Sequence, residues 1–185
     1  MRKIIAIVGD AQIEKDGPKY KMAFEMGKTL VDNGYRVQSG GMGGVMEAAF
    51  LGAKSSKNYK EGDTIALLPS FNHKEVNPYA DIVIPTGLDV MRNALVANAK
   101  CVIAIGGGAG TLSEIAFAWS LKRMIIAFKN VDGWSSKVAD TKMDHRVRYN
   151  FEDKVFGVES AKEAIDIINK KLDLYDKHHE GIELL

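Results

Sequence analysis

At 185 residues, with 46% hydrophobic and 26% charged residues and a formal net charge of +1, the sequence has the composition of one globular domain. A chain of this length buries enough surface to fold without a metal or a disulfide. The balanced charge argues against an extended nucleic-acid groove or a surface for anionic membranes, and no apolar run approaches the roughly 18 residues of a membrane span. We therefore expect a cytoplasmic protein without nucleic-acid or membrane partners.

Six short apolar runs, rich in β-branched residues, predict strands along the chain. They are residues 3–8, 36–38, 64–68, 82–85, 101–105 and 124–128. The first stops at Gly9-Asp10, which makes it too short for a signal peptide. Because the runs are continuous rather than alternating, they indicate strands that are buried on both faces, as in a parallel sheet.

Amphipathic helices are predicted between these strands, at residues 19–33, 45–54, 91–99, 111–121 and 160–172. Gly34 is a plausible stop for the first, and Ser160 with Glu163 forms a capping box at the last. Residues 129–158 are less regular, with a short helix predicted at 135–139 and a late strand. This alternation predicts an α/β fold over residues 1–172, a doubly wound, mostly parallel sheet with helices on both faces. A polar tail, residues 173–185, follows it.

The cysteine and the histidines predict neither an intrachain disulfide nor a structural metal site. Cys101 is the one cysteine and lies in an apolar run, which favours a buried core position. The histidines have no metal-ligand spacing with it or with one another, and they are His73, His145, His178 and His179. We expect no bound metal.

Two glycine-rich turns each follow a predicted strand and open a predicted helix. Glycines let the backbone approach a phosphate closely, and the first amides of the next helix point at it with the helix dipole behind them. The predicted phosphate-binding residues are Gly40, Gly41, Gly43, Gly44, Gly107, Gly108, Ala109, Gly110 and Thr111. The Thr111 hydroxyl is expected to contact the phosphate or to cap its helix. Both turns are expected to converge on one pocket.

Other nucleotide motifs do not fit. The dinucleotide pattern G-x-G-x-x-G would need glycine at Met46 in the first turn and at Thr111 in the second. Gly27-Lys28-Thr29 mimics the end of a P-loop, but Met22 stands where the first glycine of that motif belongs, and the triplet lies inside a predicted helix.

Three motifs occur in an order that resembles a known family: Gly-Gly-x-Gly-Gly-x-Met from Gly40, then Met91-Arg92-Asn93, then Gly-Gly-x-Gly-Thr-x-x-Glu from Gly107. The chain looks like the LOG-type, so-called lysine decarboxylase-like proteins, and within them like the branch related to molybdenum cofactor carriers. The resemblance covers about residues 3 to 170 and implies a Rossmann-like fold. Nothing in the sequence looks like a pyridoxal-phosphate site.

The resemblance implies two alternative functions. LOG enzymes are phosphoribohydrolases that release the base and ribose 5-phosphate from nucleoside 5′-monophosphates. The resemblance implies that Glu114 and Arg92 are the catalytic residues here and that no cofactor is required. Carrier relatives hold a phosphorylated pterin without turnover. The enzymes have an Arg-Lys pair where this chain has Arg92-Asn93, or Met91-Arg92 if the motifs are aligned without a gap. The missing pair favours a carrier. The presence of Glu114 favours an enzyme. The enzyme is the main prediction. The alternative is a non-catalytic, phosphate-anchored protein that carries a molybdenum cofactor or senses a nucleotide, and the ligand is expected to be a nucleoside monophosphate or a phosphorylated pterin.

The chemistry of the residues allows the same two readings. A Glu114 carboxylate could stabilise an oxocarbenium-like transition state, or only favour the dipole of its helix. Arg92 could clamp a phosphate or form an ion pair. Further possible ligand contacts are Gly9, Asp10, Glu47 and Asn93, with a solvent-facing acid as the alternative for Glu47 and an Asx turn for Asp10.

The resemblance also implies a homodimer or homotetramer. The apolar segment 115–119 could serve such an interface, or equally form a core helix.

Overall fold

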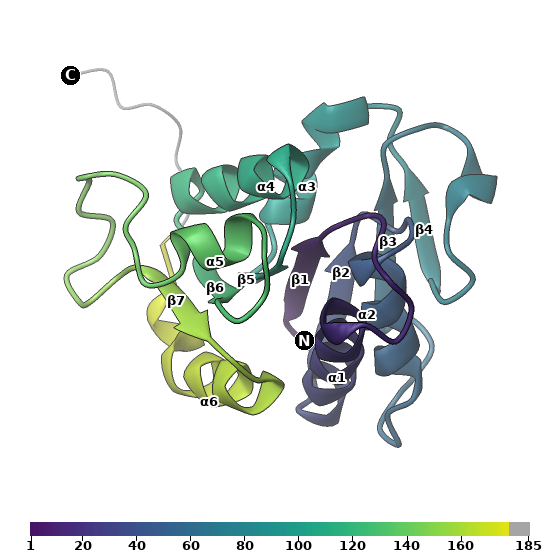
Figure 1. Cartoon of the computed structure of the whole chain (residues 1–185), viewed down its shortest axis with the longest axis horizontal. Coiled ribbons are helices and arrows are strands. Elements are labelled where there is room, and N and C mark those ends of the chain that lie inside the picture. The colour runs from purple at the N-terminus through teal and green to yellow at the C-terminus, as the bar shows by residue number, and fades with distance from the viewer. Residues whose placement is uncertain (178–185) are drawn as a thin grey trace.

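In the computed structural model, which describes residues 1–177, seven strands form one sheet (Figure 1). Every neighbouring pair is parallel, in the order β4-β3-β2-β1-β5-β6-β7. The order reverses between β1 and β5, where open α/β sheets hold their ligands. The bounds are β1 Ile4–Gly9, β2 Arg36–Ser39, β3 Thr64–Leu68, β4 Ile82–Pro85, β5 Cys101–Ile105, β6 Met124–Phe128 and β7 Val155–Val158.

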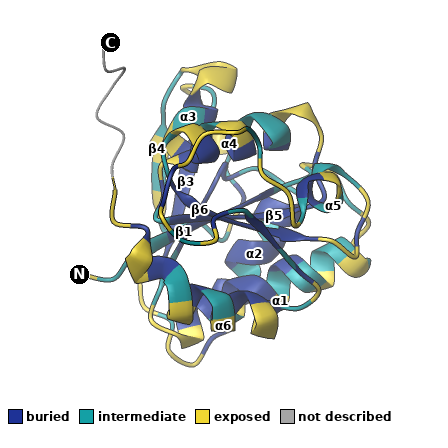
Figure 2. Cartoon of the chain, turned by 90° about the vertical axis from the view of Figure 1, so that its left-hand side faces the viewer, coloured by how far each residue is buried: buried dark blue, intermediate teal, exposed yellow. Residues whose placement is uncertain are grey.

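Helices cover both faces of the sheet. One layer consists of α1, α2 and α6, and the other of α3, α4 and α5; Figure 2 shows the buried strands between helices whose outer faces are exposed. None of the helices in residues 1–177 is long and apolar enough to cross a membrane. The bounds are α1 Pro18–Asp32, α2 Val45–Lys54, α3 Asn93–Ala97, α4 Ala109–Ser120, α5 Trp134–Val138, α6 Ala161–Lys171, and the 3₁₀ turns η1 His73–Glu75, η2 Asp89–Arg92 and η3 Leu172–Leu174.

The predicted doubly wound sheet is confirmed, and its six predicted strands agree with the structure to within one residue at either end. The helix predicted at residues 91–99 is wrong as a single element, because η2 and the short α3 replace it. Val96 and Ala97 are buried while Met91 and Leu95 are exposed, so the apolar residues of this segment do not share one buried stripe. α4 begins two residues before the predicted start, which places Thr111 in its first turn.

Arg148 makes the main polar contacts of the irregular segment before β7. The Arg148 guanidinium donates two 2.7 Å hydrogen bonds to Asp153 and stacks 3.5 Å from the centre of the Trp119 ring. Asp153 also accepts a 2.8 Å hydrogen bond from the Tyr175 hydroxyl. Tyr175 is 3% exposed, so ordered packing continues past residue 172. His178 and His179 lie outside the described residues.

Two local predictions are settled by burial. Cys101 is fully buried in β5, and burial raises the pKa of its thiol above the usual range, as expected of a core residue. In the segment 115–119, Ile115, Ala118 and Trp119 are buried in the core beneath α4. The segment is therefore chiefly a core helix.

Two glycines let α1 and α2 touch backbone to backbone. A Cβ on Gly27 would lie 1.9 Å from the Ala49 carbonyl oxygen, and a Cβ on Gly52 would lie 1.9 Å from the Phe24 carbonyl oxygen. The triplet that mimics a P-loop thus lies inside α1, and its glycine is needed for helix packing.

We expect Gly27→Ala to destabilise the protein by about 1–3 kcal/mol, because the added methyl forces the two helices apart. Alanine has the better helix propensity by about 1 kcal/mol, so a loss of stability isolates the packing effect. Urea denaturation measures it, with the exposed neighbour variant Lys28→Ala as the control. Unchanged stability of Gly27→Ala would mean that the helices do not approach this closely.

Candidate functional site

The two glycine turns lie at the carboxyl edge of the sheet, after β2 and β5, the two strands that flank β1. They line a common pocket of about 220 Å³. The first turn contributes Gly40, and the second contributes Gly108, Gly110, Thr111 and Glu114. The end of β1 adds Gly9 and Asp10, and the η2–α3 junction adds Arg92 and Asn93. Segments far apart in the sequence thus meet at the point where the strand order reverses.

Other predicted residues shape the turns without lining this pocket: Gly41, Gly43, Gly44, Glu47, Gly107 and Ala109. Gly41 has a φ of +76°, and its carbonyl accepts hydrogen bonds from the backbone and side-chain nitrogens of Asn77. Gly44 passes the end of β1 so closely that a Cβ would lie 2.2 Å from the Asp10 carbonyl oxygen. Glu47 is half-buried beside Gly43.

The start of α4 presents unpaired amides at the pocket. Gly108 is its N-cap, and within the described part of the chain the backbone amides of Ala109, Gly110 and Thr111 donate no hydrogen bond. Such amides and the helix dipole together attract an anion. Because Gly108 occupies the cap position, Thr111 is not a cap, and its 4% exposed side chain lies at the pocket wall.

A buried ion pair with loose geometry forms one wall. Arg92 and Glu114 are 6% and 7% exposed, and their closest nitrogen and oxygen atoms, Nη1 and Oε1, are 3.5 Å apart. A charged N–H···O bond is normally about 2.7–2.9 Å long. Within residues 1–177, no atom accepts a hydrogen bond from the buried Nε atom of Arg92. The guanidinium therefore has donor capacity that its own chain does not use.

Burial controls the charge of this pair. It raises the pKa of the Glu114 carboxyl to about 7, against the opposing effect of the Arg92 charge. Burial also lowers the pKa of Arg92, opposed by Glu114, but a guanidinium remains protonated in proteins. Gly40 makes room for it, since a Cβ there would lie 2.6 Å from both terminal nitrogens of Arg92. Near neutral pH the pocket wall therefore carries a full positive charge and a partial negative one.

Asp10 connects both turns to α1. Its carboxylate accepts hydrogen bonds from Lys19 Nζ at 2.7 Å and from the Gly107 amide at 2.9 Å. Its backbone carbonyl accepts from the Val45 amide, at the start of α2, at 2.9 Å. Asp10 thus makes an ion pair and a contact between loops.

Asn93 also joins two elements. Its side-chain amide donates to Ser113 Oγ at 2.9 Å, and so ties α3 to α4. Asn93 therefore both connects two helices and lines the pocket beside Arg92.

Sequence reasoning missed several residues around the pocket. The sequence indicates Lys19 only as part of an amphipathic helix, and Ser39 and Met42 are uncharged. Met46 is the last residue of the first glycine motif but was not predicted to line the pocket. Ser135 is fully buried; its Oγ accepts from the Gly106 amide at 2.8 Å and donates to the Phe128 carbonyl at 2.7 Å. Ser135 lies in the irregular segment 129–158, where no sequence pattern indicates a contact with the glycine turn.

A second hollow, of about 400 Å³, shares Asp10 with the first. It lies between the β1–α1 loop and the segment after β6, and its polar lining includes Gln12, Lys19, Asn130 and Asp132. Among residues 1–177 no group of three or more His, Cys, Asp or Glu side chains is placed to hold a metal ion.

The chain is similar to a known protein family and to a protein of an archaeon. A model of the SLOG cluster4 family (LDcluster4) matches residues 2–165. A protein of Archaeoglobus fulgidus, described only as uncharacterized, is 35% identical over 127 residues, which are 68% of this chain and 79% of that protein.

Solved structures also match, and two of them are bacterial and algal proteins. The molybdenum cofactor binding protein of Rippkaea orientalis is 32% identical with a TM-score of 0.74, over 92% of this chain and 97% of that one. The molybdenum cofactor carrier protein of Chlamydomonas reinhardtii is 27% identical with a TM-score of 0.73, over 93% and 99%.

We expect Asp10→Ala to lower the free energy of unfolding by about 1–3 kcal/mol, because the Gly107 amide and Lys19 lose their acceptor. Asp10→Asn keeps an acceptor for the Gly107 amide and should be intermediate. Asp132→Ala is the matched control, since Asp132 also contacts Lys19, at 3.1 Å, but from a side chain that is 93% exposed. This variant should leave stability nearly unchanged. Equal effects of Asp10→Ala and Asp132→Ala in urea denaturation would contradict the bridging role.

Proposed function

Since the chain belongs to the SLOG cluster4 family, we propose that it is a binding protein that holds a small phosphorylated molecule by its phosphate and does not turn it over. Two relatives of known structure that cover nearly the whole chain are a molybdenum cofactor binding protein and a molybdenum cofactor carrier protein. A phosphorylated pterin is therefore the ligand class that these likenesses favour.

The observation that carries the proposal is the unused donor capacity around one pocket. The buried Arg92 has an unpaired Nε and only a 3.5 Å contact to Glu114. Gly110 and Thr111, whose backbone amides donate no hydrogen bond within residues 1–177, line the same pocket. Burying a guanidinium without short hydrogen bonds is costly, and a phosphate would supply the missing acceptors bidentately.

The size of the two hollows constrains the rest of the ligand. A pocket of about 220 Å³ is small beside the roughly 300–1,000 Å³ of ordinary ligand sites, so it suits a phosphate and little more. The adjoining hollow of about 400 Å³ begins at Asp10 and offers amide and carboxylate groups. In our proposal the phosphate binds against α4, and the heterocycle extends past Asp10 toward Asn130 and Asp132.

The second candidate function is a nucleoside-monophosphate phosphoribohydrolase, which is favoured by the presence of a carboxyl group, Glu114, beside the proposed phosphate position. Cleavage of the glycosidic bond builds positive charge on the sugar, and a carboxylate stabilises that charge only when it is ionised. With its pKa raised to about 7, Glu114 is largely neutral at pH 6 and only partly ionised at pH 7. A bound phosphate would favour the neutral form further. A carboxyl pKa near 7 also suits a general acid or base, so an assay of the reaction product decides between the two functions.

Ligand titration with a product assay distinguishes these functions. We expect calorimetric binding of a phosphorylated pterin and of AMP or GMP, much weaker binding of their dephosphorylated forms, and no free base after prolonged incubation at pH 7–8. Arg92→Ala should abolish binding, and Arg92→Lys should restore only part of it, because an ammonium lacks the bidentate fork. Release of free base that disappears in Glu114→Gln would instead establish the hydrolase. Equal affinity for phosphorylated and dephosphorylated ligands would rule out anchoring by the phosphate.

The Glu114 pKa predicts how pH affects anion binding. Above pH 7 the carboxyl group is ionised and repels a bound phosphate; below pH 7 it is protonated, and the repulsion disappears. We expect Glu114→Gln to bind inorganic phosphate about tenfold more tightly than the wild type at pH 8, a difference of about 1.4 kcal/mol, and about equally at pH 6. Comparing the two proteins at each pH cancels the ionisation of phosphate itself. A constant ratio of affinities between pH 6 and pH 8 would contradict a raised pKa.

A further inference from the structure

A third hollow lies at the amino edge of the sheet, opposite the edge that holds the phosphate pocket. It encloses about 420 Å³, which is within the roughly 300–1,000 Å³ of ordinary ligand sites. Lys3, Lys100 and Arg123 line it, and they directly precede β1, β5 and β6. Because the strands are parallel, the residues that precede them meet at one edge. Ile4 and Leu95 add apolar walls. We call this space the amino-edge hollow.

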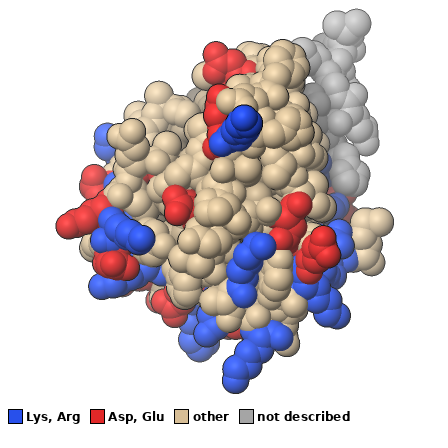
Figure 3. All heavy atoms as spheres, turned by 90° about the vertical axis from the view of Figure 1, so that its right-hand side faces the viewer, with Lys and Arg blue, Asp and Glu red and all other residues tan. Residues whose placement is uncertain are grey.

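The lining of the amino-edge hollow is positively charged. Among residues 1–177 it includes no acidic side chain but four cationic ones: Arg2, Lys3, Lys100 and Arg123. Two carboxylates outside the lining offset part of this charge, since Arg2 pairs with Asp63 at 2.5 Å and Lys3 pairs with Asp173. Four positive charges less two negative ones leave a net charge of +2. Elsewhere both signs of charge are mixed, as on the face of the molecule at the β4 end (Figure 3).

Arg36 adds a further cation beside the hollow. Side chains alternate between the two faces of a strand, and in β2 Val37 packs on the α1–α2 side of the sheet. Arg36 and Gln38 therefore face the α3 side, where Gln38 lines the hollow. Arg36 is also paired in register with Ile4, another lining residue. Within residues 1–177 its buried Nε atom donates no hydrogen bond. This guanidinium, like that of Arg92, thus retains an unused donor.

Other donors serve carbonyl groups at the ends of α3 and α4. Lysine and arginine side chains near a helix C-terminus often donate to its last carbonyls, and both helices end at this edge. Here Gln38 Nε2 donates to the Val96 carbonyl at 3.0 Å, and Arg148 Nη1 donates to the Trp119 carbonyl at 2.7 Å. The half-buried Lys100 side chain makes no hydrogen bond or ion pair within the described chain, so its charge is available to a ligand.

Arg123 is held at the hollow by another lining residue. Its Nε and Nη2 atoms donate to Asn98 Oδ1 at 3.1 and 2.6 Å, and the residue is only 8% exposed. A carboxamide oxygen carries no formal charge, so this contact orients the guanidinium without neutralising it.

We propose that the amino-edge hollow is a second binding site, for a small organic anion that carries at least two negative charges. The net positive charge favours a multivalent anion, and cationic side chains bind carboxylate or phosphate groups through charge-assisted hydrogen bonds. The hollow is larger than a phosphate needs, and the walls formed by Ile4 and Leu95 suit an apolar part of the ligand. Because the site lies at the other edge of the sheet from Arg92, the proposal stands independently of the phosphate pocket.

Nitrogen–proton correlation spectra of the full chain, titrated at pH 8 with phthalate and with phenyl phosphate, test the proposal. Both probes join two negative charges to one aromatic ring, so the tighter binder distinguishes a carboxylate ligand from a phosphate ester. We expect saturable shifts of the Ile4, Gln38 and Lys100 amides at millimolar concentration with at least one probe, and none with the neutral benzyl alcohol. The amides of residues 109–111 report the phosphate pocket separately, so failure at either site is recognised by itself.

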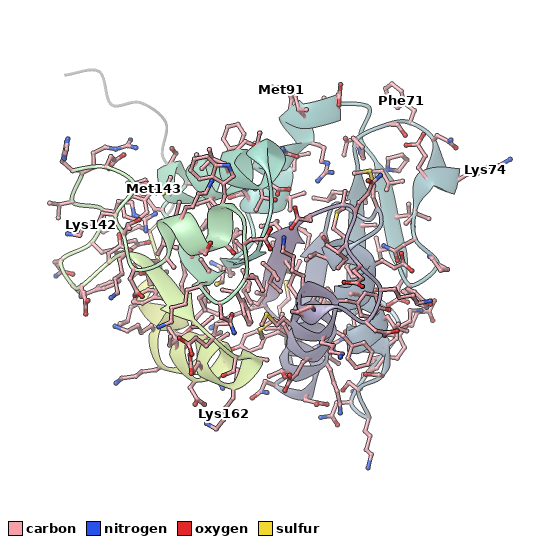
Figure 4. All side chains as sticks on the ribbon, in the orientation of Figure 1. Phe71, Lys74, Met91, Lys142, Met143 and Lys162 are labelled. Carbon is pink, nitrogen blue, oxygen red and sulfur yellow. The ribbon has the colours of Figure 1, made fainter. Side chains whose placement is uncertain are left out.

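Lys100→Gln and Arg36→Met should each weaken binding at the hollow by about tenfold, because each removes one charge, while methionine keeps an apolar stem in place of that of Arg36. Lys74→Gln is the matched control, since Lys74 projects into solvent from η1 (Figure 4), and it should bind the probes as the wild type does. Circular dichroism melts establish that each variant is folded, and Lys100→Gln decides the outcome if Arg36→Met does not fold. The proposal is overturned if neither probe shifts the hollow amides saturably, if benzyl alcohol shifts them equally, or if the folded variants keep full affinity.

Discussion

The placement of the whole site depends on Asp10, the first residue after β1. Its carboxylate holds the Gly107 amide of the second turn and Lys19 of α1, while its carbonyl holds the first amide of α2. Two turns that are more than sixty residues apart in the sequence are thereby fixed on either side of one strand end. The interaction also uses up the Gly107 amide, so that the anion-attracting amides are those further along, from Ala109 to Thr111.

Around that frame the site is electrostatically incomplete. In a finished core, a buried arginine and glutamate would make short, bidentate hydrogen bonds, as Arg148 and Asp153 do at 2.7 Å elsewhere in this chain. Arg92 and Glu114 instead stand 3.5 Å apart, and one guanidinium nitrogen has no partner. The contrast between two buried pairs in one protein supports assigning Arg148 to stability and Arg92 to ligand binding. It also explains why the pKa of Glu114 rises, since so loose a contact compensates burial only in part.

Glycines serve three distinct purposes in this fold. Gly27 and Gly52 allow two helix backbones to touch, and Gly44 lets a turn pass the end of β1. Gly40 leaves space for the guanidinium of Arg92. Of these four glycines, Gly40 lines the pocket. The same absence of a side chain therefore has a different consequence at each place, and the neighbour across the gap decides which.

The sequence alone determined the sheet, its parallel sense and the two glycine turns, because apolar runs, helix periodicity and glycine positions act within a few residues of one another. Arg92 and Glu114 were singled out by the family resemblance. The sequence did not determine that Gly41, Gly44 and Gly107 shape the turns while Gly40, Gly108 and Gly110 face the pocket, nor that Lys19 and Ser135 support it. It also gave no sign of the gap between the Arg92 and Glu114 side chains or of the exposure of Ile82 and Ile84 in β4. Those features depend on strand order, side-chain rotamers and where a helix layer ends, and these are fixed only when the whole chain packs.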